Sequence, residues 1–219
     1  MNYKEISIPT YIINLPSRTD RRESVAKEFE GRMEFDVHFV EAETHPIKAV
    51  GLWESIKKII KTVVAKGEDD VIIICEDDHI FTPYYDRDKF LSQVLLSAEL
   101  GTHILYGGVC RYGNLVPVTK ELFWLDWSWW TQFIVLYRPA FEKILRAEFT
   151  EKDVADEFLS QILANKLMIY PFISKQRNFG YSDIATSHYQ EERHERLFIE
   201  ACNRTETYLR IIEKYQLLP

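Results

Sequence analysis

Three carboxylates, Glu76, Asp77 and Asp78, end an apolar run in the segment VIIICEDD at 71–78. The run is too short for a helix and is apolar on both faces, so it predicts a buried central strand. Open α/β sheets bind ligands at the carboxyl ends of their strands, where these side chains would lie. Because three crowded anions repel one another, a divalent metal is the first candidate for a bound group. The alternative is a solvated acidic turn.

A second group of residues that could bind a ligand is basic. Arg18, Arg21 and Arg22 lie where a strand predicted at 11–15 meets a helix. The start of a helix offers free amide groups and arginines offer charge, so this turn could bind a phosphate. The alternative is a solvated helix start whose arginines pair with neighbouring carboxylates.

Tryptophan is concentrated in one stretch, FWLDWSWWTQ at 123–132, which holds four of the five in the chain. One small core rarely needs so many. Sugars are commonly held against flat aromatic faces by apolar contact of their C–H surfaces, which makes the stretch a candidate sugar site. Core packing is the alternative, and we expect it to account for at least two of the four.

A second acidic group begins a later helix. Asp153, Asp156 and Glu157 lie in the first turn of a helix predicted at 153–164. Acidic residues there interact favourably with the helix dipole, so stability alone can explain them. His188 lies further on, in a polar segment without periodicity that predicts a loop.

The elements that must position these side chains alternate along the chain. Predicted strands lie at 11–15, 35–40, 71–75, 103–106, 133–137 and 167–173. Predicted helices lie at 17–29, 52–66, 89–100, 139–145, 153–164 and 191–215. This order predicts an α/β fold in which strands joined by helices pair in parallel. Pro171 interrupts the last strand and places it at an edge of the sheet. The segment 111–120 predicts a loop or a weak hairpin.

The last helix carries an apolar stripe that repeats at steps of three and four residues. Its members are Phe198, Ala201, Thr205, Tyr208, Ile212 and Tyr215. Such a stripe must pack on something. The remainder of the same domain is the default, and a dimer partner is the alternative, so the oligomeric state stays open.

Composition restricts the class of protein. At 219 residues, with 46% hydrophobic and 28% charged residues, the chain fits one globular domain with a substantial core. A formal net charge of −7 argues against non-specific nucleic-acid binding, which depends on clustered Lys and Arg. The three cysteines are widely spaced and odd in number, which fits reduced thiols.

The cellular location is expected to be the cytoplasm. The N-terminal residues lack the basic start and apolar core of a signal peptide, and no apolar run is long enough for a membrane span. Lys57, Lys58 and Lys61 share one helix face and could contact the inner membrane surface peripherally. A solvated face explains them as well.

Three stretches together resemble glycosyltransferase family 25, the lipooligosaccharide and galactosyl transferases, whose fold is of the Rossmann-like GT-A type. They are YIINLPSRTDRR at 11–22, VIIICEDDHIF at 71–81 and YPFISKQRNFGYSDI at 170–184. The resemblance spans most of residues 10–185. It implies a single GT-A-like domain over 1–219, with a mixed, mainly parallel sheet flanked by helices. A nucleotide-sugar half would span about 1–110, an acceptor and catalytic half about 111–189, and a C-terminal helix about 190–219.

The resemblance also implies roles for individual residues on the donor side. The acidic triplet matches the DxD element, so Asp78 would bind Mn²⁺ or Mg²⁺, and Glu76 or Asp77 would contact the ribose or a metal-bound water. The metal would bridge the two phosphates of a UDP-sugar. The first βα turn would bind the nucleotide through Asn14, Leu15, Arg18 and Arg21. His188 is the candidate for a further metal ligand.

On the acceptor side, the resemblance implies inversion at the anomeric carbon, which needs a carboxylate base. Asp156 is the first candidate; Glu157, Asp153 and Asp126 stay open. Trp127, Trp129 and Trp130 would shape the acceptor pocket. The chain departs from the family pattern at THPIKAVGLWESI, residues 44–56, where many members have a Gly-Cys and Ser-His stretch.

The function implied is metal-dependent transfer of a sugar, of galactose type, from a UDP-sugar to a cell-surface glycan or glycolipid acceptor. The departure at 44–56 favours an alternative, a non-catalytic GT-A-like domain that binds a glycan or a protein. A nucleotidyltransferase of related fold would need a glycine-rich phosphate loop, and INLPSRTDRR has no glycine.

Overall fold

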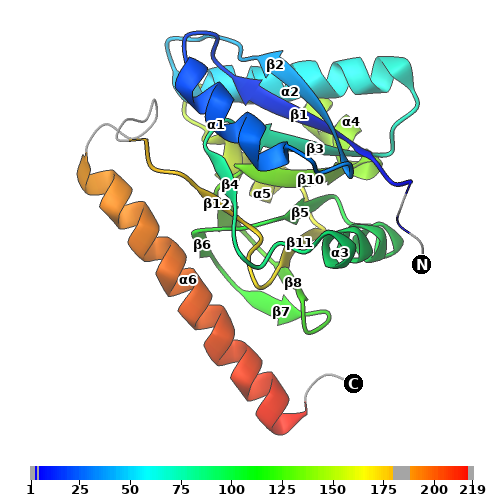
Figure 1. Ribbon diagram of the computed structural model, residues 1–219, viewed down its shortest axis with the longest axis vertical. Coiled ribbons are helices and arrows are strands. Elements are labelled where there is room, and N and C mark those ends of the chain that lie inside the picture. The colour runs from blue at the N-terminus through cyan, green and yellow to red at the C-terminus, as the bar shows by residue number, and fades with distance from the viewer. Residues whose placement is uncertain (1–2, 4, 180–187, 217–219) are drawn as a thin grey trace.

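The structure is a computed structural model that describes residues 3, 5–179 and 188–216, with side chains of residues 188–194 left out. Its main feature is an eight-stranded sheet in the order β2-β1-β3-β10-β5-β11-β8-β7 (Figure 1). The strands of this sheet are β1 (Ile8–Asn14), β2 (Phe35–Glu41), β3 (Val71–Glu76), β5 (Ile104–Tyr106), β7 (Leu115–Pro117), β8 (Leu122–Leu125), β10 (Phe133–Tyr137) and β11 (Lys166–Ile169).

Two short ribbons extend from this sheet. Strand β4 (His79–Phe81) pairs with β12 (Ser174–Gln176), and β6 (Arg111–Tyr112) pairs with β9 (Ser128–Trp129), each antiparallel. In the main sheet β2 and β3 both pair with β1 in parallel, and β5 pairs with β11 in parallel. Strands β10 and β8 run against the others. The fold is therefore mixed α/β with a mainly parallel sheet, as predicted.

Helices cover both faces of the sheet (Figure 1). They are α1 (Thr19–Phe29), α2 (Lys48–Lys66), α3 (Arg87–Glu99), α4 (Arg138–Arg146), α5 (Ala155–Ile162) and α6 (His188–Tyr215). Apolar residues of α1 and α3 pack on one face, and those of α2, α4, α5 and α6 pack on the other. The sheet thus separates two hydrophobic cores.

Strand β3 is central because both of its faces are apolar. Ile72 and Ile74 belong to one core, and Ile73 and Cys75 belong to the other. All four side chains are buried. An apolar run without alternation is what a strand covered on both sides requires, so this prediction is confirmed. The strand ends at Glu76, at the carboxyl edge of the sheet.

Several element boundaries differ from prediction. Pro9 lies inside β1, which begins earlier than the strand predicted at 11–15. The pairing of β1 with β3 begins only at Thr10, so no hydrogen bond to β3 requires the N–H that proline lacks. Pro171 follows β11 instead of interrupting it, and β11 lies between β5 and β8, so its predicted edge position is wrong. The segment predicted as a loop or weak hairpin contains β6 and β7.

Differences also occur in two helices. Helix α5 begins at Ala155, so Asp153 precedes it and accepts hydrogen bonds from Thr150 instead. The stripe of α6 packs on its own domain, where Ala201, Thr205 and Ile212 are buried. Tyr215, the last member of the stripe, is 62% exposed because the helix extends past the sheet (Figure 1).

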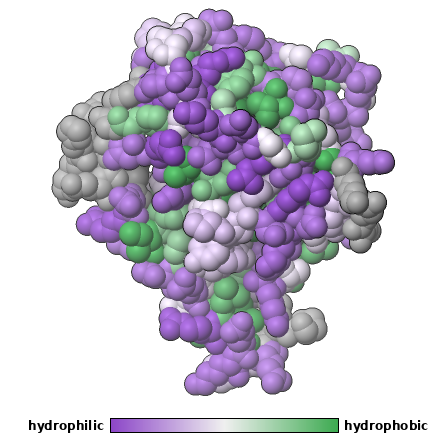
Figure 2. Space-filling model, viewed as in Figure 1, coloured by the Kyte–Doolittle hydropathy of each residue, from purple (hydrophilic) through white to green (hydrophobic). Residues whose placement is uncertain are grey.

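Within the described ranges, the structure contains no helix with the length and apolarity needed to cross a bilayer. Hydrophilic residues cover most of the face seen in Figure 2. On α2, Lys58 pairs with Glu43 at 2.7 Å, and Lys57 lies 3.8 Å from Glu54. Peripheral membrane contact by this basic face stays a prediction.

Candidate functional site

A cavity of about 910 Å³ lies at the carboxyl edge of the sheet. This volume is within the range of small-molecule sites, about 300–1,000 Å³. Its lining includes residues of the β1–α1 turn, the end of β3, the β9–β10 connection and the start of α5. The predicted site residues among its lining are Leu15, Arg18, Arg21, Glu76, Asp77, Asp78, Trp129, Trp130, Asp156 and Glu157.

Asp77 is held by the protein itself. Its Oδ2 accepts a hydrogen bond from Nδ2 of Asn14 at 2.9 Å, and its Oδ1 accepts one from the Arg21 guanidinium at 3.1 Å. Asn14, Arg21 and Asp77 are all buried. Both oxygens therefore have protein donors, and Asp77 joins the ends of β1 and β3 to helix α1.

Asp78 has a different environment. Its Oδ1 is buried and has no hydrogen-bond partner in the part of the chain that the structure describes. Its Oδ2 lies 3.7 Å from the Arg21 guanidinium. Burial and the charge of Asp77 raise the pKa of Asp78 to about 7, although Arg21 opposes the shift. Within the described residues, Oδ1 of Asp78 can therefore accept a further donor or a cation.

Glu76 is the third carboxylate of the edge. Its Oε1 accepts a hydrogen bond from the Thr131 hydroxyl at 2.8 Å. Burial and the negative charge of Asp78 raise the pKa of Glu76 to about 8, and Asp156 adds to the shift. The charges of Asp78 and Asp156 therefore both act on Glu76, although Asp156 lies far away in the sequence.

A divalent metal fits these residues only in part. Residues 3, 5–179 and 195–216 contain no group of three or more His, Cys, Asp or Glu side chains that could hold a metal ion. Mg²⁺ in phosphate-binding sites typically uses one or two carboxylates and completes its shell with water and substrate phosphates. Glu76 and the unpartnered oxygen of Asp78 meet that requirement. The side chain of His188 lies outside the described residues.

The three arginines of the first βα turn separate in space. Arg18 and Arg21 line the cavity, whereas Arg22 lies over the ring of Phe39, 3.9 Å from its centroid. Arg21 is 5% exposed and also lies 4.8 Å from the ring centroid of Phe179. Arg21 is thus a buried counter-charge for Asp77 and Asp78, and Arg18 is the more accessible cation.

Across the cavity, Asp156 lies in the first turn of α5. Its Oδ2 accepts from the backbone N–H of Trp130 at 3.1 Å, and its Oδ1 accepts from the N–H of Glu157 at 2.8 Å. Burial raises the pKa of Asp156, and these two hydrogen bonds oppose the shift. Glu157 accepts a hydrogen bond from the indole Nε1 of Trp129 at 3.0 Å.

Only part of the tryptophan group reaches the cavity. Trp129 lines it in a half-buried position, whereas Trp130 is 8% exposed and packs its ring on Phe198 of α6. Trp127 is not among the lining residues and lies 6.2 Å from Trp129, centroid to centroid. Of the three tryptophans predicted to shape the acceptor pocket, Trp129 and Trp130 line the cavity and Trp127 does not. Trp124 packs against the core, as the alternative reading expected.

The two remaining candidates for a catalytic base lie elsewhere. Asp126 accepts hydrogen bonds from Asn114 and from the N–H of Trp127, and so holds a turn. Asp153 bonds to Thr150. Neither lines the cavity, which leaves Asp156 and Glu157.

Sequence reasoning missed three groups of lining residues. The first belongs to the segment at 43–52, where the chain departs from the family pattern. A Cβ on Gly51 would lie 2.6 Å from the carbonyl oxygen of Glu43, so this glycine allows the segment to fold against α2.

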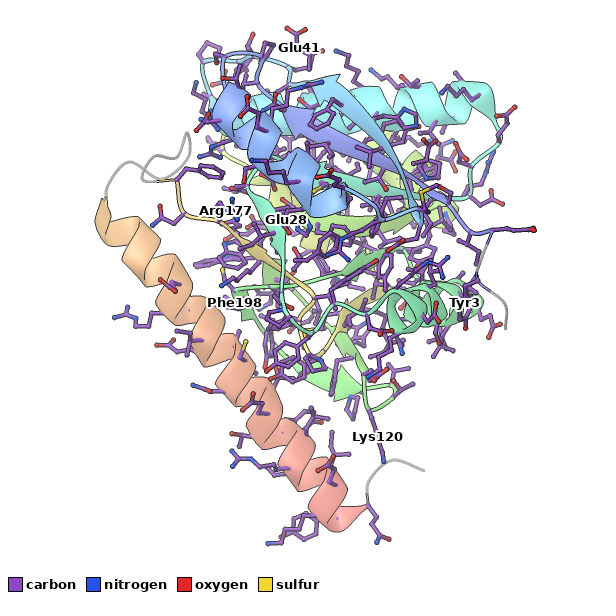
Figure 3. All side chains as sticks on the ribbon, in the orientation of Figure 1. Tyr3, Glu28, Glu41, Lys120, Arg177 and Phe198 are labelled. Atoms are coloured by element: carbon purple, nitrogen blue, oxygen red, sulfur yellow. The ribbon has the colours of Figure 1, made fainter. Side chains whose placement is uncertain are left out.

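The second group of lining residues, 175–179, begins within β12 and continues past its end. There, the N–H of Arg177 donates to the backbone carbonyl of Asp78 at 2.6 Å, and its side chain lies beside Glu28 (Figure 3). The third is at the start of α6.

Comparisons with known proteins define the fold alone. No family model and no curated protein matches the chain. The solved structure of A197 from STIV matches with a TM-score of 0.51 and 12% identity over 84% of this chain and 100% of that chain. A glycosyltransferase involved in glycosylation of the major capsid of PBCV-1 matches with a TM-score of 0.51 and 14% identity, over 87% and 98% of the two chains. The fold of this chain is thus GT-A-like, and membership of family 25 stays a prediction.

Proposed function

We propose that the protein is a metal-dependent glycosyltransferase that moves a sugar from a UDP-sugar to a cell-surface glycan or glycolipid, with inversion. One observation carries the proposal: the acidic triplet, Arg18 and Asp156, predicted separately, all line one cavity in a GT-A-like fold. A solvated acidic turn or a merely dipole-stabilising helix start would not require this convergence.

The donor would bind at the edge formed by residues 1–110. Glu76 and Asp78 would hold Mn²⁺ or Mg²⁺, because their crowded and partly unpartnered oxygens favour a cation. The metal would supply charge stabilisation for the departing diphosphate. Arg18 adds a cation to the same cavity. The hydrogen bonds that Asp77 accepts from Asn14 and Arg21 would hold the β1–α1 turn in place for the nucleotide.

The acceptor would bind toward residues 111–189. Its hydroxyl would lose a proton to Asp156 while the oxygen forms a bond to the anomeric carbon. The bond from that carbon to the diphosphate breaks, and UDP leaves with the bonding electrons. Burial raises the pKa of Asp156 toward the range in which a general base works well at neutral pH. Trp129 would contact the acceptor sugar.

Thermal unfolding with a panel of nucleotide sugars tests the proposal. A donor at about one hundred times its Kd stabilises the folded state by about 2.7 kcal/mol. For a chain of this size, that corresponds to a rise of about 5–10 °C in the midpoint. The rise should require both a UDP-sugar and Mn²⁺.

Two variants make the result specific. Asp78→Asn should abolish the metal-dependent rise, whereas Asp88→Asn, on the exposed side of α3 and outside the cavity, should keep it. If no nucleotide changes the midpoint of the unmodified protein, the non-catalytic binding domain becomes the better assignment.

A further inference from the structure

Helix α6 reaches the cavity, although the family resemblance ends before it. Glu195, Phe198 and Ile199, in the N-terminal half of the helix, line the cavity opposite the end of β3. Figure 3 shows Phe198 on the face of α6 that is turned toward the sheet. The helix is therefore part of the wall of the site as well as a cover for the core.

Phe198 contacts two aromatic rings. It stacks on Trp130 with ring centroids 5.5 Å apart and an angle of 22° between the rings. It also lies 5.5 Å from the ring of Phe172, which is 2% exposed. The indole of Trp130 is thereby fixed from the α6 side by an apolar contact.

The backbone of Trp130 has an unusual conformation. Its φ is 87°, in the left-handed region that a bulky residue seldom adopts. Such a conformation persists where the surroundings determine it. In this conformation the N–H of Trp130 donates to Oδ2 of Asp156 at 3.1 Å. The orientation of this peptide thus decides where the carboxylate of Asp156 is held.

Hydrogen bonds to the rest of the domain hold α6 in place and so fix the position of Phe198 against Trp130. The Thr205 hydroxyl lies 2.7 Å from that of Tyr112, and Arg204 donates to the carbonyls of Tyr112 and Gly113. The hydroxyl of Tyr170 donates to the carbonyl of Cys202 at 3.2 Å. These bonds lie one to two turns after Phe198, so the position of its ring is fixed by the helix.

We propose that α6 belongs to the catalytic site and that Phe198 is a positioning residue for Asp156. Phe198 packs on the Trp130 ring, which keeps the Trp130 peptide in its left-handed conformation, and that peptide orients the Asp156 carboxylate. The inference rests on the proposed function only where it treats Asp156 as the base. The contact itself can be tested without turnover.

Nitrogen-15 labelling of tryptophan alone gives a simple spectrum, because the chain has five tryptophans. Trp130→Phe assigns the Trp130 backbone amide signal. Phe198→Ala and Phe198→Leu should both move this signal and speed its exchange with solvent, whereas Phe198→Tyr should restore it. Ile211→Ala, at a position that is 43% exposed on the same helix and outside the cavity, should leave it in place. An unchanged Trp130 amide in both the Ala and Leu variants would overturn the inference.

Kinetics separate positioning from simple loss of packing. In Phe198→Leu, kcat should fall by about tenfold to a hundredfold, while the Mn²⁺-dependent midpoint shift with the UDP-sugar stays at its original size. A loss of donor binding with unchanged kcat would contradict the positioning role. If no nucleotide sugar binds the unmodified protein, the proposed function and the catalytic half of the inference fail together. The Trp130 amide still decides whether Phe198 holds that peptide.

Discussion

Removal of the Arg21 guanidinium should strongly destabilise the protein. Arg21 donates to Asp77 at 3.1 Å and lies 3.7 Å from Asp78, and the side chains of Arg21 and Asp77 are 6% and 9% exposed. Substitution by methionine retains most of the apolar length and removes the charge. Two carboxylates would then remain crowded at the end of β3 without their nearest cation.

The burial of this pair determines the magnitude. Screening by water is small for side chains so little exposed, and breaking a buried ion pair from one side typically costs about 3–5 kcal/mol. Folded domains are stable by about 5–15 kcal/mol in total. We therefore expect Arg21→Met to remove about a fifth or more of the stability at pH 7.

Urea unfolding of a double-mutant cycle measures this directly. The cycle contains Arg21→Met, Asp77→Asn and the double variant, compared at pH 7 without divalent metal. The double variant should be clearly more stable than the sum of the single losses predicts, because each single variant already loses the Arg21–Asp77 interaction and the double variant loses it only once. A loss below about 1 kcal/mol for Arg21→Met, or strict additivity, would refute the buried counter-charge.

Three further outcomes are expected. Burial raises the pKa of Glu76 to about 8 and that of Asp78 to about 7, above the values near 4 of unfolded chains, so the folded protein binds more protons across that interval. The free energy of unfolding should therefore fall as pH rises from about 4 to about 8 without metal, and Asp78→Asn should make the fall shallower. Lys166→Met should cost about 1–3 kcal/mol in urea unfolding, because the buried amine donates to two carbonyls at the end of α5. Gly108→Ala should cost about 1–3 kcal/mol or more, since its Cβ would lie 1.9 Å from the carbonyl oxygen of Ser174.

Each of these outcomes has a contrary result. A free energy of unfolding that rises over the same pH interval in both proteins would contradict the raised carboxyl pKa values. For the lysine, exposed Lys143→Met on α4 is the matched control, and equal losses would show that the two carbonyl bonds contribute nothing. A Gly108→Ala protein as stable as the original would mean that β12 can move away without cost.

Much of the fold could be predicted because its patterns are local. The continuous apolar run of β3 specifies a strand covered on both faces, and the stripe of α6 specifies a helix packed on one side. Pro171 was wrongly predicted to interrupt the last strand of the sheet, because β11 ends at Ile169, before the proline. The predicted α5 start was too early because Asp153 instead bonds to Thr150.

The sequence placed the acidic triplet and the first βα turn at one edge of the sheet, and both line one cavity, but it did not indicate how the environments of the three carboxylates differ. Strand ends of a mainly parallel sheet meet at one edge, so the triplet and the first βα turn could be placed together. Asp77 is bonded on both oxygens, whereas Oδ1 of Asp78 has no hydrogen-bond partner among the described residues; this difference depends on contacts with Asn14 and Arg21 far away in the chain. No local pattern contains such information.

The contribution of α6 to the cavity was missed for the same reason. The stack between Trp130 and Phe198 joins residues that are distant in sequence, and the apolar stripe of α6 is equally compatible with ordinary core packing.

Binding of Mn²⁺, followed by its electron paramagnetic resonance signal, tests the central claim that the triplet forms a site for a metal and a nucleotide diphosphate. The described residues offer two carboxylates for the ion, so phosphate oxygens are needed to complete its shell. We expect weak binding of Mn²⁺ alone, much tighter binding when UDP is present, and loss of that increase in Asp78→Asn. Binding that is independent of UDP, or that persists unchanged in Asp78→Asn, would contradict this claim.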